Sequence, residues 1–314
     1  MQTRFLQRTS GGSYLISLPK DWVRSNGLEK GSQVGLFSHV KDLMVIDPKP
    51  LKGPEPREAE IMMSEDIGRE LTAHYLSGHD RILVRSERMV KPEEKEKIRI
   101  SASRLAGLEV INETSHTMLL VNLSMPLDLS VEDVMKRMHQ IGSSMFKDTL
   151  TAVSEAETQL AANVVERDDA LDRLYFLVIR LLKTTIGDLR LADEMNVDPS
   201  QCLDLRLAAS IMEKIGDNCV DMCSHLLQSK KAELLPKEAI SVGSEMLERY
   251  AEATRALLVG DFKLANKVGR SRHSVNRRIS ELGEGITREG RYLVDLMEDL
   301  ADHIFDIADV VTVG

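Results

Sequence analysis

The sequence predicts a multidomain protein of the α+β class with three parts. Residues 1–50 form a β-rich head, residues 58–125 a small α/β domain, and residues 130–314 an all-α domain of two three-helix bundles. Three observations support this division. Four prolines between positions 48 and 56 mark a linker, strand-like and helix-like runs alternate after it, and the pattern from Ser130 onward is wholly helical.

The composition is that of a soluble, helix-rich protein. Hydrophobic residues make up 42% of the 314 positions, charged residues 29%, and aromatic residues only 4%. No apolar run approaches the roughly 18 residues that a membrane span needs, and residues 1–14 lack the continuous hydrophobic segment of a secretory signal. The three cysteines have no zinc-type spacing and suit reduced core residues. We therefore expect a cytoplasmic protein without membrane insertion.

The net charge of −9 is unevenly spread along the chain. Residues 1–50 contain seven Lys and Arg against four Asp and Glu, a balance of +3, so the other 264 residues carry −12. A basic head on an acidic protein is compatible with a DNA-binding module joined to an acidic partner domain.

The head reads as short strands around one short helix. Residues 3–17 have strand character and are interrupted by a turn at Gly11 and Gly12. Pro19 opens a helix at its first turn, where a missing N–H has no consequence, and the helix ends at Asn26-Gly27. Two more strands follow, at 34–37 and 43–46.

One signature runs through this head. It consists of Arg4, Gly12, Ser13, Tyr14, the run from Leu18 to Val23 and the run from Gly27 to Val34. Over residues 3–48 it resembles the AbrB-like swapped-hairpin DNA-binding domain, in which two chains interleave their hairpins into one barrel. The resemblance implies a homodimer through the N-terminal domain. It also implies DNA contacts from Arg4, Arg8, Lys20 and Arg24. The alternative is a dimerisation module that no longer binds DNA.

The middle domain alternates helix and strand. An amphipathic helix follows Ser64 and stops at Gly78, a strand covers 81–85, and a charged helix covers 91–105. Residues 109–123 then suit a closing hairpin, which predicts a small α/β sandwich. No catalytic constellation occurs here. Three histidines are interpreted as isolated surface or packing residues: His74, His79 and His116.

The all-α domain contains six predicted helices. Their ranges are 130–155, 157–188, 201–230, 237–259, 261–289 and 291–312. Ser130 caps the first helix, and acids follow in its first turn as the helix dipole prefers. Breaks come at Asp198-Pro199 and Pro236, so the two antiparallel bundles divide near 231–236.

A short acidic helix pattern occurs twice in this domain, 85 positions apart. Each copy has carboxylates at i, i+4 and i+8 after a methionine: Glu213, Asp217 and Asp221, then Glu298, Asp302 and Asp306. Asp168 and Asp172 form a further i,i+4 pair one helix earlier. Acids at this spacing form one ridge and repel each other. A hard cation such as Mg²⁺, Mn²⁺ or an iron ion would relieve that repulsion, and a solvated helix face would also do so.

Residues 130–314 resemble PhoU, the phosphate-uptake regulator built from two three-helix bundles with a Glu/Asp-x-x-x-Asp motif. The resemblance implies a metal site in the first bundle formed by Asp168, Asp172, Glu213, Asp217 and Asp221. A degenerate site in the second bundle would use Glu298, Asp302 and Asp306. Aligning the repeats places Arg272 and Asn276 where Asp168 and Asp172 stand, so a cationic side chain replaces part of that set.

The order of an AbrB-like head, an α/β middle and a PhoU-like tail resembles archaeal PhoU-type regulators. This resemblance implies a DNA-binding transcriptional regulator of phosphate uptake and intracellular phosphate homeostasis, with negative regulation of phosphate metabolism. The tail would sense metal or phosphate status and contact a phosphate transporter ATPase or sensor protein. The alternative is an adaptor that does not bind DNA and regulates a phosphate transporter through protein contacts.

No enzymatic activity is predicted. A di-iron carboxylate bundle would need Glu-x-x-His pairs projecting into its core. None occurs on the second, third, fifth or sixth predicted helix of the all-α domain.

Overall fold

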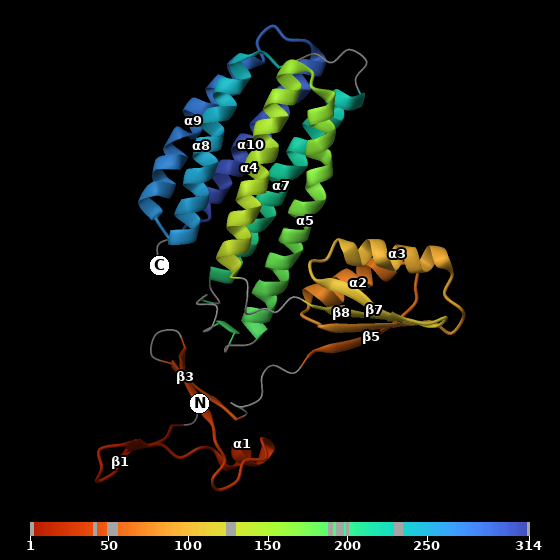
Figure 1. Ribbon diagram of the computed structural model, residues 1–314. Coiled ribbons are helices and arrows are strands. Elements are labelled where there is room, and N and C mark those ends of the chain that lie inside the picture. The colour runs from red at the N-terminus through yellow and green to blue at the C-terminus, as the bar shows by residue number, and fades with distance from the viewer. Residues whose placement is uncertain are drawn as a thin grey trace. The chain divides into compact units, whose positions relative to one another are not determined.

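A computed structural model gives the arrangement of the chain. It describes residues 3–39, 43–48, 56–123, 130–187, 191–192, 198, 201–228 and 235–312. The predicted linker prolines at 50 and 54, and the predicted breaks at Pro199 and 231–234, lie outside these residues. The chain divides into two compact units, Met1–Glu55 and Pro56–Gly314 (Figure 1). The second unit holds both the α/β domain and the helices, and the predicted multidomain α+β class is confirmed.

The first unit consists of two hairpins and one helix. In chain order its elements are β1 (Gln7–Arg8), β2 (Tyr14–Leu15), α1 (Lys20–Ser25), β3 (Gly35–His39) and β4 (Leu43–Asp47). β1 pairs with β2 and β3 with β4, both antiparallel. Gly12 turns the first hairpin at φ 88°, a conformation that glycine adopts without strain. The helix begins at Lys20, and Pro19 is its cap rather than its first residue.

The residues of the first unit whose exposure is described enclose no apolar core within one chain. No side chain is buried among its residues whose exposure the structure describes. Phe5, Leu15 and Leu36 are 91%, 54% and 62% exposed, although their sequence character is that of strand interiors. Apolar side chains in this arrangement need a further surface to cover them.

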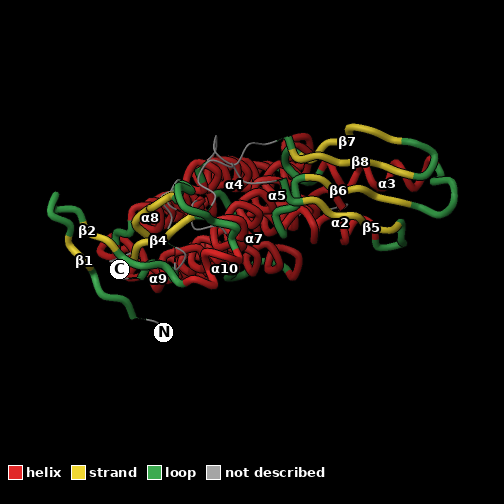
Figure 2. Tube along the Cα trace, turned by 90° about the horizontal axis from the view of Figure 1, so that it is seen from below, coloured by secondary structure: helices red, strands yellow, loops and turns green. Residues whose placement is uncertain are grey.

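The second unit begins with a four-stranded sheet and two helices. They are β5 (Glu58–Met62), α2 (Ile67–Leu76), β6 (Arg81–Arg85), α3 (Pro92–Ser103), β7 (Leu108–Glu113) and β8 (Thr117–Asn122). The strand order is β5-β6-β8-β7, and only the β5–β6 pair is parallel (Figure 2). Sequence reasoning missed β5, because Ile61 is its one buried residue and two of its five residues are glutamates.

The two helices pack on one face of this sheet. Ile82, Val84 and Leu120 point from the strands into a core that Leu71 and Ile98 complete from the helices. The two predicted strands of the closing hairpin are confirmed as β7 and β8. This α/β layer therefore forms its own small core within the second unit.

In the described part of the chain after residue 130, six long helices follow. The first bundle contains α4 (Val131–Glu155), α5 (Thr158–Gly187) and α7 (Gln201–Gln228); the second contains α8 (Glu238–Val259), α9 (Phe262–Leu282) and α10 (Arg288–Asp309). The bundles pack through α4 against α8 and α7 against α10, and share one core (Figure 1). Ser130 caps α4 as predicted, its Oγ accepting from the N–H of Asp133 at 3.0 Å.

One helix is shorter than the sequence predicted. α9 ends at Leu282 rather than 289, because Gly283 and Gly285 follow and Gly285 adopts φ 76°. All three cysteines are buried and free. Within the described residues, none of the helices is both long and apolar enough to cross a membrane.

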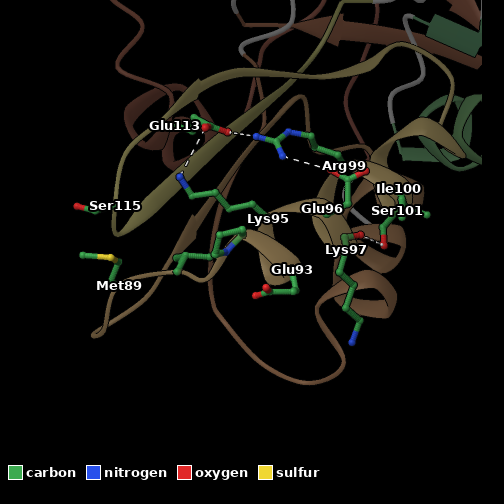
Figure 3. A pocket seen from close by; sticks show the side chains of 12 residues that line it. Met89, Glu93, Lys95, Glu96, Lys97, Arg99, Ile100, Ser101, Glu113 and Ser115 are labelled. Carbon is green, nitrogen blue, oxygen red and sulfur yellow. Dashed lines mark hydrogen bonds and ion pairs between the residues drawn. The ribbon is translucent and has the colours of Figure 1, made fainter.

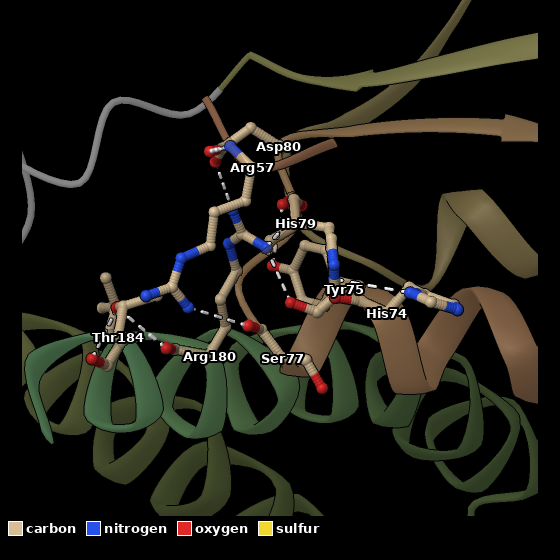
Figure 4. A network of polar contacts seen from close by, with 10 residues as sticks. Arg57, His74, Tyr75, Ser77, His79, Asp80, Arg180 and Thr184 are labelled. Atoms are coloured by element: carbon tan, nitrogen blue, oxygen red, sulfur yellow. Dashed lines mark hydrogen bonds and ion pairs between the residues drawn. The ribbon is translucent and has the colours of Figure 1, made fainter. Parts of the chain in front are cut away.

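A buried arginine joins the α/β layer to the first bundle (Figure 4). Arg180 of α5 is 4% exposed, and its Nη1 donates to the carbonyl oxygens of Tyr75 and His79 at 2.6 and 2.8 Å. Its Nη2 donates to Oδ1 of Asp80 at 2.6 Å. His79 also meets His74 edge to face, with ring centroids 4.8 Å apart, so the prediction that these histidines are isolated is wrong. The junction fixes the C-terminal end of α2 against α5.

Candidate functional site

The four cations predicted to contact DNA all lie on the surface of the first unit. Arg4 precedes β1, Arg8 ends it, and Lys20 and Arg24 lie on α1; all four are exposed. Lys20 and Arg24 are spaced i,i+4, so they project from the same side of α1 with their Cβ atoms roughly 6 Å apart. This helix face therefore offers two adjacent positive charges to a polyanion.

The acids predicted in the first bundle lie on the two helices α5 and α7, which pack against each other, and Asp217 and Asp221 among them are exposed. The set comprises Asp168, Asp172, Glu213, Asp217 and Asp221, called here the acidic ridge. Burial raises the pKa of Asp168 to about 6, and the charges of Asp172 and Asp217 add to the shift. Burial likewise raises the pKa of Glu213 to about 7, again with Asp217 adding to it. These carboxylates repel each other across the helix interface.

Close approach of the two helices depends on Gly216. A Cβ at this position would lie 2.4 Å from Cδ2 of Leu171 and 3.4 Å from Oδ1 of Asp168. That Oδ1 atom is buried and has no hydrogen-bond partner. A buried carboxylate oxygen without a donor is unfavourable. A bound cation would satisfy it.

Two side chains from outside the first bundle also act on the ridge. Burial is the largest cause that raises the pKa of Asp172, and the charges of Asp217 and Asp169 raise it further. The charge of Arg104 lowers it. Burial also raises the pKa of Asp217, and His303 of α10 acts in the opposite direction. Sequence reasoning missed Arg104 and His303. Only His303 could have been found from the repeat, because it occupies the position in the second copy that Asn218 occupies in the first. Asn218 is a buried polar residue that donates to the carbonyl oxygen of Leu296 at 3.4 Å.

The donor chemistry of the ridge fits a hard cation. All its ligands would be carboxylate oxygens, which Mg²⁺ and Mn²⁺ prefer. Among the described residues, however, no three His, Cys, Asp or Glu side chains lie close enough to hold a metal ion as they stand. Binding would require the ridge side chains to turn toward one another.

The second acidic set is paired with arginines. Asp306 accepts from Nη2 of Arg272 at 2.8 Å, and the same guanidinium reaches Asp309 at 3.3 Å. Glu298 lies 3.4 Å from Arg291, and Asp302 is exposed. Arg272 thus occupies the place opposite these acids that the repeat alignment assigned to it, and supplies a counter-charge from the protein itself.

Hollows on the two sides of α3 differ in character. The larger, of about 1080 Å³, lies between α3 and the end of β7 at Glu113, with Ser115 of the following turn (Figure 3). Two of its cations are already paired, since Glu113 lies 2.6 Å from Arg99 and 3.5 Å from Lys95. The smaller, of about 560 Å³, lies between α2, α3 and α5, and Asp172 of the ridge lines it.

Comparisons with known proteins agree with both halves of the sequence reading. Residues 135–226 match the PhoU domain model, and residues 7–54 match the model of the MazE bacterial antitoxin, for antidote-toxin recognition. A phosphate-specific transport system accessory protein PhoU homolog of Xylella fastidiosa is 28% identical over 93 residues, covering 30% of this chain. The match spans 36% of that relative's length.

Two crystal structures are also similar to part of this chain. PhoU from Streptococcus pneumoniae has 16% identity and a TM-score of 0.47, covering 58% of this chain and 91% of its own. PhoU from Pseudomonas aeruginosa has 19% identity and a TM-score of 0.44, covering 58% and 93%. One region of this chain, residues 135–226, thus matches the PhoU domain, and an N-terminal region, residues 7–54, matches the MazE antitoxin domain.

Proposed function

We propose that the chain is a dimeric DNA-binding regulator of phosphate transport and phosphate homeostasis. The observation that carries this proposal is the union, in one chain, of an AbrB/MazE-type head with a PhoU domain. The relatives named above are a phosphate transport accessory protein and a phosphate transport regulatory protein. We assign the chain a regulatory role of the same kind and no catalytic step.

Charge and exposure support the DNA-binding half of the proposal. The head carries +3 on a protein of net −9, and the cations of α1 are exposed. Phosphate contacts of this kind supply affinity independent of sequence and make binding strongly dependent on salt. The exposed apolar strands of the head are the surface that a second copy would cover.

The double change Lys20→Ala with Arg24→Ala tests this half. We expect DNA affinity to fall at least about tenfold, and the slope of log K against log salt to become shallower by about 4, because each of the two chains in the dimer loses two phosphate contacts. Fluorescence anisotropy with genomic DNA fragments between 50 and 200 mM salt measures both. Lys263→Ala with Lys267→Ala is the matched control, because these exposed lysines have the same spacing on α9.

Two outcomes would count against this assignment. Equal losses in both double variants would indicate a general effect of net charge. A wild-type dimer that does not bind DNA at low salt would favour the second candidate function, an adaptor that regulates a phosphate transporter through protein contacts.

We further propose that the acidic ridge binds a hard divalent or trivalent cation such as Mg²⁺, Mn²⁺ or iron. Support comes from the buried, unpartnered oxygen of Asp168 and the raised pKa values of Asp168 and Glu213. When bound, the cation would supply the positive charge that this ridge lacks. The residues expected to hold it are Asp168, Asp172, Glu213, Asp217 and Asp221.

Asp217→Asn should abolish Mn²⁺-dependent stabilisation and slightly stabilise the metal-free protein, because it removes like-charge repulsion. In the folded protein the pKa of Asp168 is about 6 and that of Glu213 about 7, and both lie above the ordinary values of 3.8 and 4.5. Ionising these groups therefore disfavours folding, and the metal-free protein should gain stability from this ridge as pH falls from 8 to 5. Mn²⁺ should stabilise most at pH 8, because protons compete with it.

Thermal melts of the full chain at pH 5 and pH 8, with and without Mn²⁺, measure these effects. Glu166→Gln, an exposed change on α5, should behave as wild type in all four conditions. A rise in melting temperature on adding Mn²⁺ that is the same in wild type and Asp217→Asn would place the cation elsewhere.

A further inference from the structure

A further hollow, called here the α4–α5 groove, lies between the first two helices of the first bundle. Its volume is about 460 Å³, and Ala106, from the turn between α3 and β7, contributes to its wall. Small-molecule sites in proteins have volumes of roughly 300–1,000 Å³. The groove is therefore large enough for a small ligand.

The spacing of residues along each helix brings the lining of the groove together. On α4, Val134, Arg137 and Ile141 follow one another at three and four positions, so they share one face of the helix. The lining residues of α5 have the same spacing: Ala170, Arg173, Leu174 and Leu177. Because α4 and α5 pack against each other, the two faces form opposite walls.

The walls of the groove are mostly apolar. Val134 and Leu177 are almost fully buried and belong to the bundle core. Ile141 and Leu174 pack against that core but stay partly exposed where they line the groove. Covering such side chains with the apolar part of a ligand removes them from water, which favours binding.

Two arginines supply the positive charge of the groove. Arg137 and Arg173 are exposed, and neither has a hydrogen bond or ion pair with a described residue. Each has an aspartate four residues earlier on its own helix, Asp133 and Asp169, at a spacing where ion pairs form readily. Neither pair forms, and Asp133 instead accepts from the hydroxyl of Ser130 at 2.6 Å. Both guanidinium groups therefore remain available to a ligand.

The charge of the lining favours an anion. Among the described lining residues, Asp133 is the one acid beside the two arginines, so the balance is +1. A guanidinium group can donate two parallel hydrogen bonds to a phosphate or a carboxylate. An oxyanion at the arginines would lie next to the apolar walls.

The α/β layer completes the groove at Ala106. The hydroxyl of Tyr75 donates to the carbonyl oxygen of Ala106 at 2.9 Å, and this fixes the turn. The ring of Tyr75 in turn lies 4.9 Å from the guanidinium carbon of Arg180, which holds the end of α2. The complete wall thus requires both the first bundle and the α/β layer.

We infer that the α4–α5 groove binds a small molecule that carries an oxyanion, as a phosphate ester or a carboxylate, on an apolar body. Arg137 and Arg173 hold the oxyanion, and the apolar side chains of both helices cover the body. None of the described lining residues belongs to the acidic ridge or to the first unit. The site therefore goes beyond the proposed function and does not depend on it.

Ligand-observed NMR titration of the full chain tests the chemistry of the ligand. Phenyl phosphate joins both parts, whereas inorganic phosphate and phenol each carry only one. We expect phenyl phosphate to bind at least about tenfold more tightly than either of them. Benzoate distinguishes the two sources of the oxyanion, because tighter binding of phenyl phosphate assigns a phosphate ester and tighter binding of benzoate assigns a carboxylate.

Variants of the chain test the position of the site. Arg137→Gln and Arg173→Gln should each weaken binding of the tighter anion about tenfold, because each removes one charged donor. Arg206→Gln is the matched control, an exposed arginine on α7 outside the groove. Ala170→Trp should abolish binding by filling the groove from an exposed position, and Ala251→Trp on α8 is its exposed control.

The outcomes separate the groove from weaker alternatives. Losses in both groove arginine variants and in Ala170→Trp, with both controls binding as wild type, support the inference. Phenol or inorganic phosphate binding as tightly as the better anion overturns it, because the site would then use only one of its two parts. An equal loss in Arg206→Gln, unchanged affinity in Ala170→Trp, or a wild type that binds neither anion also overturns it.

Discussion

Arg180→Met is expected to destabilise the second unit by about 3 kcal/mol. The change keeps most of the apolar stem but removes the donors for two carbonyl oxygens and for Asp80. Breaking a buried charged pair costs about 3–5 kcal/mol, and a partner that keeps some solvent contact lowers that range. The Asp80 side chain is 33% exposed, so the lower end applies.

Urea unfolding of the full chain, followed by circular dichroism, measures this loss. Arg81→Met is the control, because its ion pair with Glu58 at 3.4 Å is exposed on both sides and should contribute less than about 1 kcal/mol. Hydrogen exchange should show the extra opening at the end of α2. If Arg180→Met unfolds at the same urea concentration as Arg81→Met, the junction does not hold the α/β layer.

Leu15→Glu combined with Leu36→Glu should convert the protein from dimer to monomer. Both leucines are more than half exposed in one chain, and they lie on β2 and β3. If a second copy covers them, each contributes about 2 kcal/mol of burial per chain, and two chains double the loss. Buried unpaired carboxylates add to it. The dimer dissociation constant should rise by at least about a thousandfold.

Sedimentation equilibrium of the full chain measures this change. Val259→Glu, an equally exposed apolar position at the end of α8, is the control and should leave the dimer intact. A wild-type monomer, or a double variant that remains dimeric, would contradict the interleaved head. The double variant should also lose DNA binding, because the two cationic surfaces would no longer be joined.

Local signals sufficed for most of the helices. Ser130 with the acids after it predicted the start of α4, and the αL glycine at Gly260 matches the predicted end of α8. Caps and periodic apolar positions act over a few residues, so one short stretch reveals them. β5 escaped because it is an edge strand with Ile61 as its one buried side chain, so its sequence has little apolar alternation.

For the candidate sites, too, the spacing of residues revealed one part and the tertiary structure decided the other. Spacing alone identified the acids of both repeats, because i,i+4 positions share a helix face whatever the surroundings. Spacing could not reveal that an arginine pairs with Asp306 in one bundle, whereas a buried oxygen of Asp168 remains unpartnered in the other. That difference depends on which helix lies opposite.

By itself, the sequence determined the class of each part of this protein, the extents of its long helices, the acidic ridge and the cations of α1. Each of these features depends on the spacing of residues that are close together in the chain. Only the tertiary structure decided that Arg104 and Asp172 line one cavity and that Arg180 is buried against the end of α2. These pairs are separated by 68 and 105 positions. Contacts at such distances leave no periodic trace, because helix packing alone brings the partners together.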